Sequence, residues 1–327
     1  MPRHIDTLLL LALPASGKSE ARRFLLNFPL EKRLELFHVA DTTQLDDFPY
    51  VHFMRCVDDA LADNGHDRVF FKGPHSGFQN PLDWGTLLHL VGDDYAVMKD
   101  PTAPTPTADP AALLARLDAA RAAVDAPAIF EAMDPALRDT VVTALQAETD
   151  RLIKELFGPR PDTIDDKTLV IEFARGGPEG SDMPIQPPHG YQWNLAQLPA
   201  EMLARAGILY IWVTPEESRR KNVERCDPND PGSILAHSAP EEVMRGDYGC
   251  DDIEYLMAQS PEPDTIQIEA HGRTWTLPIC RFDNRQDKTT FLRGDPDSWP
   301  ANDIKALHEG LADPMQKLWA AYAKLHP

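Results

Sequence analysis

The chain alternates between short continuous apolar runs and longer stretches in which apolar residues recur every three or four positions. Continuous runs at residues 7–13, 168–174 and 207–213 predict buried strands of a parallel sheet, because both faces of such strands are covered. Shorter runs at residues 34–40 and 68–72 predict two further strands. The helical spacing between the runs predicts helices on both faces of the sheet.

Helix-initiation signals support this order of elements. The segment Thr214-Pro215-Glu216-Glu217 combines an N-capping threonine, a proline at the first helical position and a capping-box glutamate. Aspartate–proline pairs predict three further helix starts, at Asp109, Asp134 and Asp313, the last of these opening the second of two closing helices. Other helices are expected over residues 19–28, 49–63 and 194–206.

Residues 73–162 interrupt the alternation of strands and helices. A Gly/Pro/Asn loop opens this stretch, and a Pro/Thr-rich connector over residues 100–110 precedes two helices. The composition predicts a mainly helical insertion between two parts of an α/β core, residues 1–72 and 163–327.

The predicted fold class is therefore α/β, a doubly wound and mostly parallel sheet with a helical insertion and a C-terminal hairpin. The hairpin is expected over residues 265–270 and 273–282, with its turn at His271-Gly272. A chain of 327 residues is long enough for one such domain with an insertion. Ligands of open parallel sheets bind at the carboxyl ends of the strands, so functional residues are expected there.

Acidic side chains outnumber basic ones by 52 to 32, which gives a net charge of −20. A protein that binds long nucleic acids needs a basic surface, because neutralising phosphates supplies much of the affinity. The charge therefore argues against a DNA or RNA partner and against an anionic membrane surface. It remains compatible with a small phosphorylated ligand in a local basic pocket.

Four cysteines, Cys56, Cys226, Cys250 and Cys280, are scattered without a C-x-x-C pair. Isolated thiols in a chain of this length indicate a reducing compartment, and we expect a cytoplasmic protein. Cys226, His237 and Cys250 form an alternative set of metal ligands, although their spacing is irregular. No apolar run approaches the length of a membrane span.

The most informative segment joins the first strand to the first helix, and it reads Leu-Leu-Leu-Leu-Ala-Leu-Pro-Ala-Ser-Gly-Lys-Ser over residues 8–19. Its last three residues match the phosphate-binding pattern G-x-x-x-x-G-K-[S/T], whereas Ala12 replaces the first glycine. In such a loop backbone N–H groups surround the phosphates, and the helix start adds the positive end of its dipole. A chance Gly-Lys-Ser at a helix start is the alternative.

This segment resembles the phosphate loop of the P-loop NTPases, and within them the adenylate-kinase-like kinases of nucleotides and small molecules. The resemblance covers the core strands and the glycine-lined loops, and it does not cover residues 73–162. It implies that Lys18 bridges the β- and γ-phosphates of ATP or a similar nucleotide, and that Ser19 ligates Mg²⁺. The nucleotide-binding residues that it implies are Pro14, Ala15, Ser16, Gly17, Lys18 and Ser19.

A Mg²⁺-nucleotide site needs a carboxylate at the end of a neighbouring strand, and two candidates are present. Glu172 lies in the run Leu-Val-Ile-Glu over residues 169–172, and the resemblance assigns it to Mg²⁺ and its bound water. Asp41 follows the predicted second strand and is assigned to the acceptor or to the role of base. Asp46 and Asp47 are close enough in sequence to share that role. Each strand-end carboxylate could instead cap a nearby helix.

Residues 218–225 contain four cationic side chains in an otherwise acidic chain. Similar kinases carry a lid here whose arginines neutralise charge on the transferred phosphoryl group, which assigns Arg219 and Arg225 to catalysis. A solvated basic helix face is the alternative. Asn284 follows the last strand, in a loop that often contacts the base in P-loop proteins. Arg175 suits an anionic acceptor or a loop salt bridge equally well.

These features predict an ATP-dependent phosphotransferase, a P-loop kinase that acts with Mg²⁺ on an unidentified small molecule. The alternative is a nucleotide-binding regulatory protein or NTPase switch whose helical insertion binds a protein partner. The two hypotheses make different predictions for residues 73–162. A regulatory protein should present an apolar surface there for its partner, whereas a phosphotransferase should use the segment to enclose a small cavity. A third hypothesis, a degenerate loop that binds no phosphate, rests on Ala12.

Overall fold

The computed structural model describes residues 3–158, 160–224 and 238–326. The described strands form a six-stranded sheet in the order β2-β3-β1-β4-β6-β5. Neighbouring strands run parallel except in the β5–β6 hairpin, so the predicted α/β class with a C-terminal hairpin is confirmed. The strands are β1 (Thr7–Leu11), β2 (Asp41–Asp46), β3 (Lys167–Phe173), β4 (Ala206–Trp212), β5 (Thr265–Ala270) and β6 (Arg273–Asp283).

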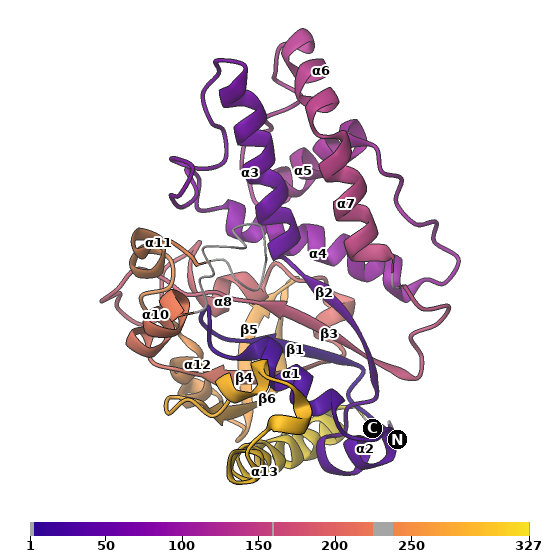
Figure 1. Cartoon of the computed structure of the whole chain (residues 1–327), viewed down its shortest axis with the longest axis vertical. Helices are drawn as coiled ribbons and strands as arrows, with labels where there is room; N and C mark the ends of the chain where they lie inside the picture. Colours follow the sequence, from indigo (N-terminus) through magenta and orange to yellow (C-terminus); the bar gives the residue numbers. More distant parts are fainter. Residues whose placement is uncertain (1–2, 159, 225–237, 327) are drawn as a thin grey trace.

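Helices surround the sheet and extend beyond it (Figure 1). Two short 3-10 helices, η1 (Thr290–Arg293) and η2 (Pro296–Ser298), follow β6. The α-helices are α1 (Lys18–Leu26), α2 (Leu30–Phe37), α3 (Phe48–Asp63), α4 (Asp83–Lys99), α5 (Pro110–Ala123), α6 (Pro135–Ala144), α7 (Gln146–Phe157), α8 (Gly190–Leu195), α9 (Ala200–Leu203), α10 (Pro215–Glu224), α11 (Glu241–Gly246), α12 (Ile253–Gln259) and α13 (Ala301–Leu325).

Both faces of the sheet are covered by apolar cores. Along β1, Leu8 and Leu10 face a core that includes α1, α2 and α13, whereas Leu9 and Leu11 face a core that includes α4, α8 and α12. Successive side chains of a strand point to opposite faces, and both sets are apolar here because neither face meets water. The continuous leucine run of β1 follows directly from this arrangement.

Helices α3 to α7 form a third apolar core beside the sheet (Figure 1). Helix α4 belongs to two cores, since Leu88 and Val91 pack towards the sheet while Leu87 and Leu90 pack among the helices. Helix α3 shares the helical core although it precedes residue 73. The division into a core and an insertion at residue 73 therefore stays a prediction.

The predicted strand over residues 34–40 is wrong. Helix α2 ends at Phe37, and β2 begins only at Asp41. Arg33 and Phe37, one helical turn apart, are both buried, which places them on the covered face of α2. A short apolar run is compatible with the period of a strand and with that of a helix. Here the burial of one helical face stabilises the helix.

The predicted strand over residues 68–72 does not join the sheet. The carboxylate of Asp58 on α3 accepts hydrogen bonds from the N–H groups of Val69, Phe70 and Phe71 at 2.8, 3.0 and 2.9 Å. Three backbone donors are thereby satisfied without a neighbouring strand. Apart from these bonds, the segment forms an isolated β-bridge between Phe71 and Phe78.

The two closing helices are a single helix, α13, which continues through Pro314. A proline inside a helix costs about 3 kcal/mol, and burial of one apolar face outweighs this cost. The buried residues of that face are Leu307, Leu311, Met315, Leu318 and Tyr322. The helix expected over residues 194–206 is not continuous, since α8 ends at Leu195, α9 covers only Ala200–Leu203, and β4 begins at Ala206. None of the helices within the described ranges is both long and apolar enough to cross a membrane.

Candidate functional site

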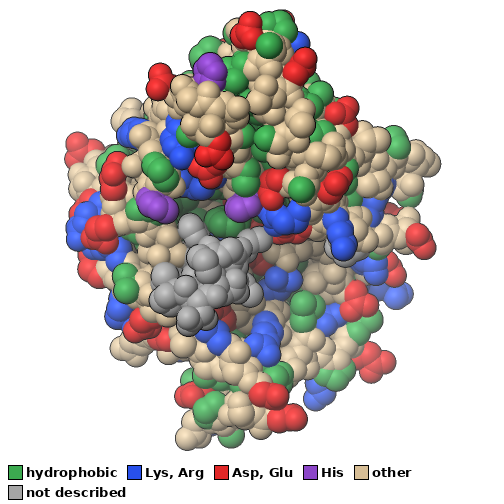
Figure 2. All heavy atoms as spheres, turned by 45° about the horizontal axis from the view of Figure 1, so that its top comes forward, with side chains coloured by type: hydrophobic (Ala, Val, Ile, Leu, Met, Phe, Trp, Pro, Cys, Tyr) green, Lys and Arg blue, Asp and Glu red, His purple; other side chains and the backbone are tan. Residues whose placement is uncertain are grey.

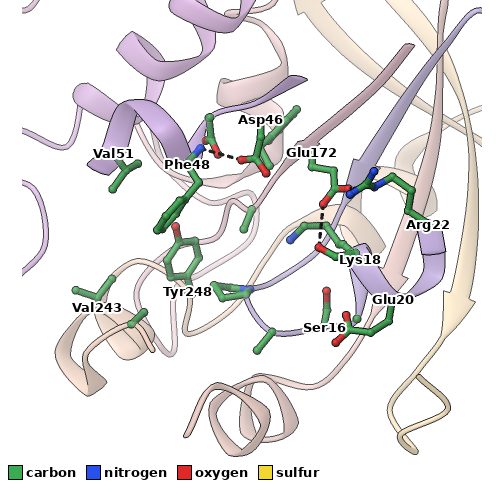
Figure 3. A pocket seen from close by; sticks show the side chains of 18 of the residues that line it. Ser16, Lys18, Glu20, Arg22, Asp46, Phe48, Val51, Glu172, Val243 and Tyr248 are labelled. Atoms are coloured by element: carbon green, nitrogen blue, oxygen red, sulfur yellow. Dashed lines mark hydrogen bonds and ion pairs between the residues drawn. The ribbon is translucent and has the colours of Figure 1, made fainter. Parts of the chain in front are cut away.

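A cavity of about 910 Å³ opens where β1, β2 and β3 end. The segment between β1 and α1 lines it, together with Asp46 from β2 and Glu172 from β3 (Figure 3). Its volume lies within the range of small-molecule sites, about 300–1,000 Å³. Its position follows the rule that parallel sheets bind ligands at the carboxyl ends of their strands.

The segment between β1 and α1 turns sharply at two residues. Ala15 and Gly17 have left-handed φ angles of 53° and 98°, and α1 begins at Lys18. A β-carbon on Gly17 would lie 2.3 Å from the Thr289 hydroxyl oxygen, so only glycine fits there. Within the described residues no side chain caps the start of α1, and the positive end of its dipole faces the cavity.

Hydrogen bonds from behind hold this turn in place. The Ser218 hydroxyl donates to the Pro14 carbonyl at 2.7 Å, and the Asn284 amide donates to the Ser16 carbonyl at 2.7 Å. The Tyr191 hydroxyl donates to the carbonyl of Ala12, which is fully buried in the apolar core. Asn284 is itself fully buried and does not line the cavity, so it supports the loop from behind.

Oxygen donors gather at the start of α1. The Ser19 hydroxyl and a Glu172 carboxylate oxygen lie 3.5 Å apart, and the other Glu172 oxygen accepts from Arg22 at 2.8 Å. Mg²⁺ prefers oxygen ligands, so Ser19 and Glu172 fit such an ion. The buried Ser16 hydroxyl has no hydrogen-bond partner among the residues described, which leaves it able to bond a phosphate oxygen.

Asp46, at the end of β2, is a partly buried acid that lines the cavity. Desolvation, reinforced by the charges of Asp47 and Glu172, raises the pKa of its carboxyl to about 8. The Phe48 N–H donates to it at 2.8 Å and, with the charge of Lys18, limits the rise. A carboxyl that titrates near neutral pH is suited to proton transfer. Figure 3 shows Asp46, Glu172 and Lys18 around one part of the cavity.

Several cations at this end of the cavity were not assigned from the sequence. Arg22 and Arg23 follow the loop on α1, and Arg293 from η1 lies beside Arg23, which donates to the Arg293 carbonyl at 3.2 Å. The spacing of Lys18 and Arg22, one helical turn apart, was the available signal. Arg293 is bonded to Glu20 at 2.7 Å. Figure 2 shows several Lys and Arg side chains near the centre of the molecular face that it displays. The net negative charge of the chain therefore does not prevent a locally basic region.

The far end of the cavity is aromatic. Phe71 and Phe78 stack at 4.6 Å between ring centroids, and Trp84 meets Tyr248 edge to face at 5.4 Å. All four line the cavity, together with Phe48 at the start of α3 (Figure 3). Flat apolar groups bind well against such surfaces. The cavity thus has one charged end and one aromatic end.

Asp41 is not part of this site, and its assignment from the sequence is wrong. It opens β2 at the amino end of the strand, where it pairs with Arg33 at 2.5 Å. Asp46 closes the same strand at its carboxyl end and lines the cavity. The error comes from the misplaced second strand. That strand was expected to end at Asp41, whereas β2 begins at Asp41 and ends at Asp46.

The predicted lid is placed only in part. Arg219 on α10 pairs with Glu216 and Glu179 at 3.3 and 3.4 Å and does not line the cavity. Arg225 lies outside the described residues, as do Cys226 and His237 of the alternative metal set.

Arg175 forms a buried salt bridge. Its guanidinium pairs with Asp47 at 2.6 Å and donates to the Asn194 side chain at 2.8 Å and to the Trp84 carbonyl at 2.9 Å. It is 2% exposed and does not line the cavity. Of the two roles considered, the salt bridge is the one observed, and it ties the end of β3 to α3, α4 and α8.

No family model, curated protein or solved structure matches the chain. Functional inference therefore depends on the residues of the cavity themselves.

Proposed function

We propose that the protein is an ATP-dependent phosphotransferase that transfers the γ-phosphoryl group to a small molecule. The observation that carries the proposal is the gathering of the Gly17-Lys18-Ser19 turn, the start of α1 and two strand-end carboxylates in one cavity. Catalysis of phosphoryl transfer consists mainly of positioning and charge neutralisation, and these groups supply both.

The nucleotide end would be the segment from Pro14 to Ser19. Backbone N–H groups at the start of α1 and the Ser16 hydroxyl would bond phosphate oxygens, with the Lys18 ammonium beside them. Ser19 and Glu172 would hold Mg²⁺, which neutralises charge on the phosphates when bound. Arg22 orients Glu172, and Arg23 and Arg293 add positive charge at the rim.

The acceptor end would be the aromatic part of the cavity, with Asp46 between the two ends. Asp46 would accept the proton of an acceptor hydroxyl as its oxygen bonds to the γ-phosphorus and the bond to the β–γ bridging oxygen breaks, releasing ADP. Phe48, Trp84 and Tyr248 would bind a flat apolar part of the acceptor. Small aromatic alcohols are therefore the first acceptors to test.

The alternative regulatory function has less support. Gly77, Phe78 and Trp84 from residues 73–162 help to enclose the cavity. The exposed large apolar side chains in the part of the chain that is described all lie outside that segment, and they are Leu26, Leu30, Met183 and Val223. A segment that helps to line a cavity and exposes no large apolar side chain among its described residues favours a small-molecule acceptor over a protein partner.

The test is calorimetric titration of the protein with MgATP. Wild type and Lys305→Ala, which removes a solvent-exposed lysine on α13, are expected to bind, whereas Lys18→Ala is expected to lose binding. Equal heats for all three proteins would refute the phosphate site. ADP release is then measured with a panel of aromatic alcohols; hydrolysis that no acceptor stimulates would support the regulatory alternative.

A further inference from the structure

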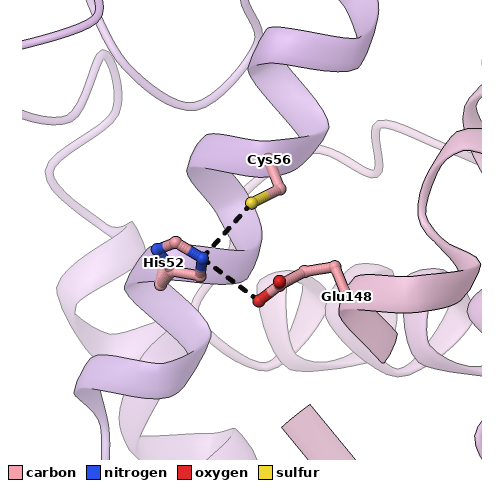
Figure 4. A group of neighbouring side chains, drawn as sticks. All are labelled: His52, Cys56 and Glu148. Carbon is pink, nitrogen blue, oxygen red and sulfur yellow. Dashed lines mark hydrogen bonds and ion pairs between the residues drawn. The ribbon is translucent and has the colours of Figure 1, made fainter. Parts of the chain in front are cut away.

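His52, Cys56 and Glu148 meet on the side of α3 that faces α7 (Figure 4). His52 and Cys56 lie one turn apart on α3, and Glu148 lies in the first turn of α7. The His52 Nε2 atom is 3.2 Å from a Glu148 carboxylate oxygen and 3.5 Å from the Cys56 sulfur. All three ligand atoms lie within 4.8 Å of one another.

These separations resemble the edges of a tetrahedral zinc site. With usual zinc–ligand distances, a tetrahedron has an N···O edge of about 3.3–3.5 Å and an N···S edge of about 3.5–3.6 Å. The sulfur–carboxylate edge would be about 3.6 Å, which a rotation of the long Glu148 side chain can reach. We propose that His52, Cys56 and Glu148 form a binding site for Zn²⁺, separate from the cavity.

The donor set favours zinc over magnesium, because imidazole and thiolate are poor ligands for Mg²⁺ and good ones for Zn²⁺. The thiol proton of Cys56 leaves to solvent when the sulfur binds the ion. The His52 side chain is 38% exposed and Cys56 is partly buried, so an ion can enter from solvent and water can fill the fourth position.

Arg151 is the principal competitor for Glu148. Its guanidinium contacts both carboxylate oxygens, with the Nε atom 3.0 Å from each. A carboxylate of a metal site is commonly hydrogen-bonded on its outer side, and Arg151 can keep that role after Glu148 turns towards the ion. Its positive charge lowers the affinity for zinc, so the site is expected to be weaker than a four-ligand structural zinc centre.

Zinc at this site would connect α3 to α7 beside the face of α3 that lines the cavity. Val51 and Arg55, on the neighbouring face of α3, line the cavity. An ion bound at His52 and Cys56 would therefore restrain the helix that carries part of the aromatic end. Binding of a metal that only the folded chain can coordinate also stabilises the fold.

The test uses metal-free, reduced protein without nucleotide, so that the Ser19–Glu172 pair is not examined at the same time. Zinc affinity is measured by competition with a chromophoric chelator, and Co²⁺ is used as a spectroscopic probe of thiolate ligation. The variants are His52→Ala, Cys56→Ser and Glu148→Gln. The matched controls are Cys250→Ser, a partly buried thiol away from the cluster, and Glu155→Gln, a second α7 partner of Arg151.

Wild type and both controls are expected to bind one Zn²⁺, to gain thermal stability with it and to show a sulfur-to-cobalt charge-transfer band. Each cluster variant should lose zinc affinity by more than about 100-fold, since even the loss of an outer-shell partner costs 10–100-fold. The metal-free thermal midpoint of each variant shows whether it folds. Unchanged zinc affinity in folded Cys56→Ser and His52→Ala would overturn the proposal. Loss of zinc binding in Cys250→Ser alone would also overturn it, because the metal would then be bound at Cys250.

Discussion

Asp46 lies directly opposite Glu172 in the parallel register of β2 and β3. The last residue of β2 and a residue near the end of β3 therefore bring two carboxyl groups to the same end of the sheet. Desolvation raises the pKa of Asp46, and the negative charges of Asp47 and Glu172 add to the rise. The arrangement separates two roles, an acid beside the Ser19 hydroxyl and an acid that titrates near neutral pH.

Replacing Asp46 with asparagine should stabilise the protein at alkaline pH. The pKa of Asp46 is raised from 3.8 to about 8 in the folded state, so the folded protein binds more protons than the unfolded chain between these values. This group therefore destabilises the fold as pH rises from about 4 to 8. Asp46→Asn should increase the free energy of unfolding at pH 9 by about 1–3 kcal/mol, allowing for solvent in the cavity, and by little at pH 4.

Urea unfolding at the two pH values measures this difference. The control is Asp139→Asn, which replaces an exposed carboxyl on α6 and should change the free energy of unfolding by less than about 0.5 kcal/mol at either pH. A pH-independent effect of Asp46→Asn would contradict the raised pKa. With an identified acceptor, the same variant should also abolish the rise in transfer rate between pH 6 and about 8.

Glu172→Gln should raise the Mg²⁺ concentration needed for half-maximal nucleotide binding by about 10-fold or more, because a neutral amide is a poorer ligand than a carboxylate. Asp41→Asn is the matched control, since Asp41 lies at the other end of β2 and should leave this concentration within about 2-fold. Titration of Mg²⁺ at fixed ATP measures both. An equal effect of the two substitutions would contradict the assignment of the metal to Glu172.

Gly17→Ala should destabilise the protein more than Gly65→Ala, although both glycines have left-handed φ angles. A β-carbon at Gly65 meets nothing within 4 Å, so only the backbone conformation costs energy, about 1–2 kcal/mol. At Gly17 the β-carbon also meets Thr289 at 2.3 Å, which adds roughly 1–3 kcal/mol of overpacking. Urea unfolding compares the two variants, and equal losses would show that the contact with Thr289 is easily relieved.

Asn284→Ala tests whether this residue recognises a base or supports the loop. The variant removes the donor to the Ser16 carbonyl, and we expect a stability loss of about 1–3 kcal/mol. Because the side chain does not line the cavity, affinities for ATP and GTP should fall by the same factor. A change in the ratio of the two affinities would instead assign Asn284 to base recognition.

Arg175→Met should be strongly destabilising because it leaves the Asp47 carboxylate without its cationic partner. Loss of one partner of a buried pair costs about 3–5 kcal/mol. The double variant Arg175→Met/Asp47→Asn should recover part of this loss. Arg245→Met removes solvent-exposed ion pairs with Glu179 and Glu241 and should have little effect. Failure of the double variant to recover stability would mean that the bonds of Arg175 to Asn194 and Trp84 dominate.

The local conformations of the chain were largely readable from the sequence. The leucine run of β1, the capped start of α10 and the turn at His271-Gly272 all appear where the pattern predicts them. The turn before Lys18 was readable as well, since Gly17 occupies a left-handed conformation that suits glycine. Short apolar runs that fit either a helix or a strand were not readable. Residues 34–40 form the end of α2 and a short connection to β2, because Phe37 packs on the covered face of the helix.

What the sequence by itself determined is the order of most elements and the position of the turn before α1, because capping, proline and glycine act on the backbone within a few residues. Only the tertiary structure decided which acid faces the cavity, since that depends on the register between β2 and β3. It also placed Asn284 behind the loop and joined His52 and Cys56 with Glu148. Such contacts arise from the packing of whole elements, and no short stretch of sequence contains both partners.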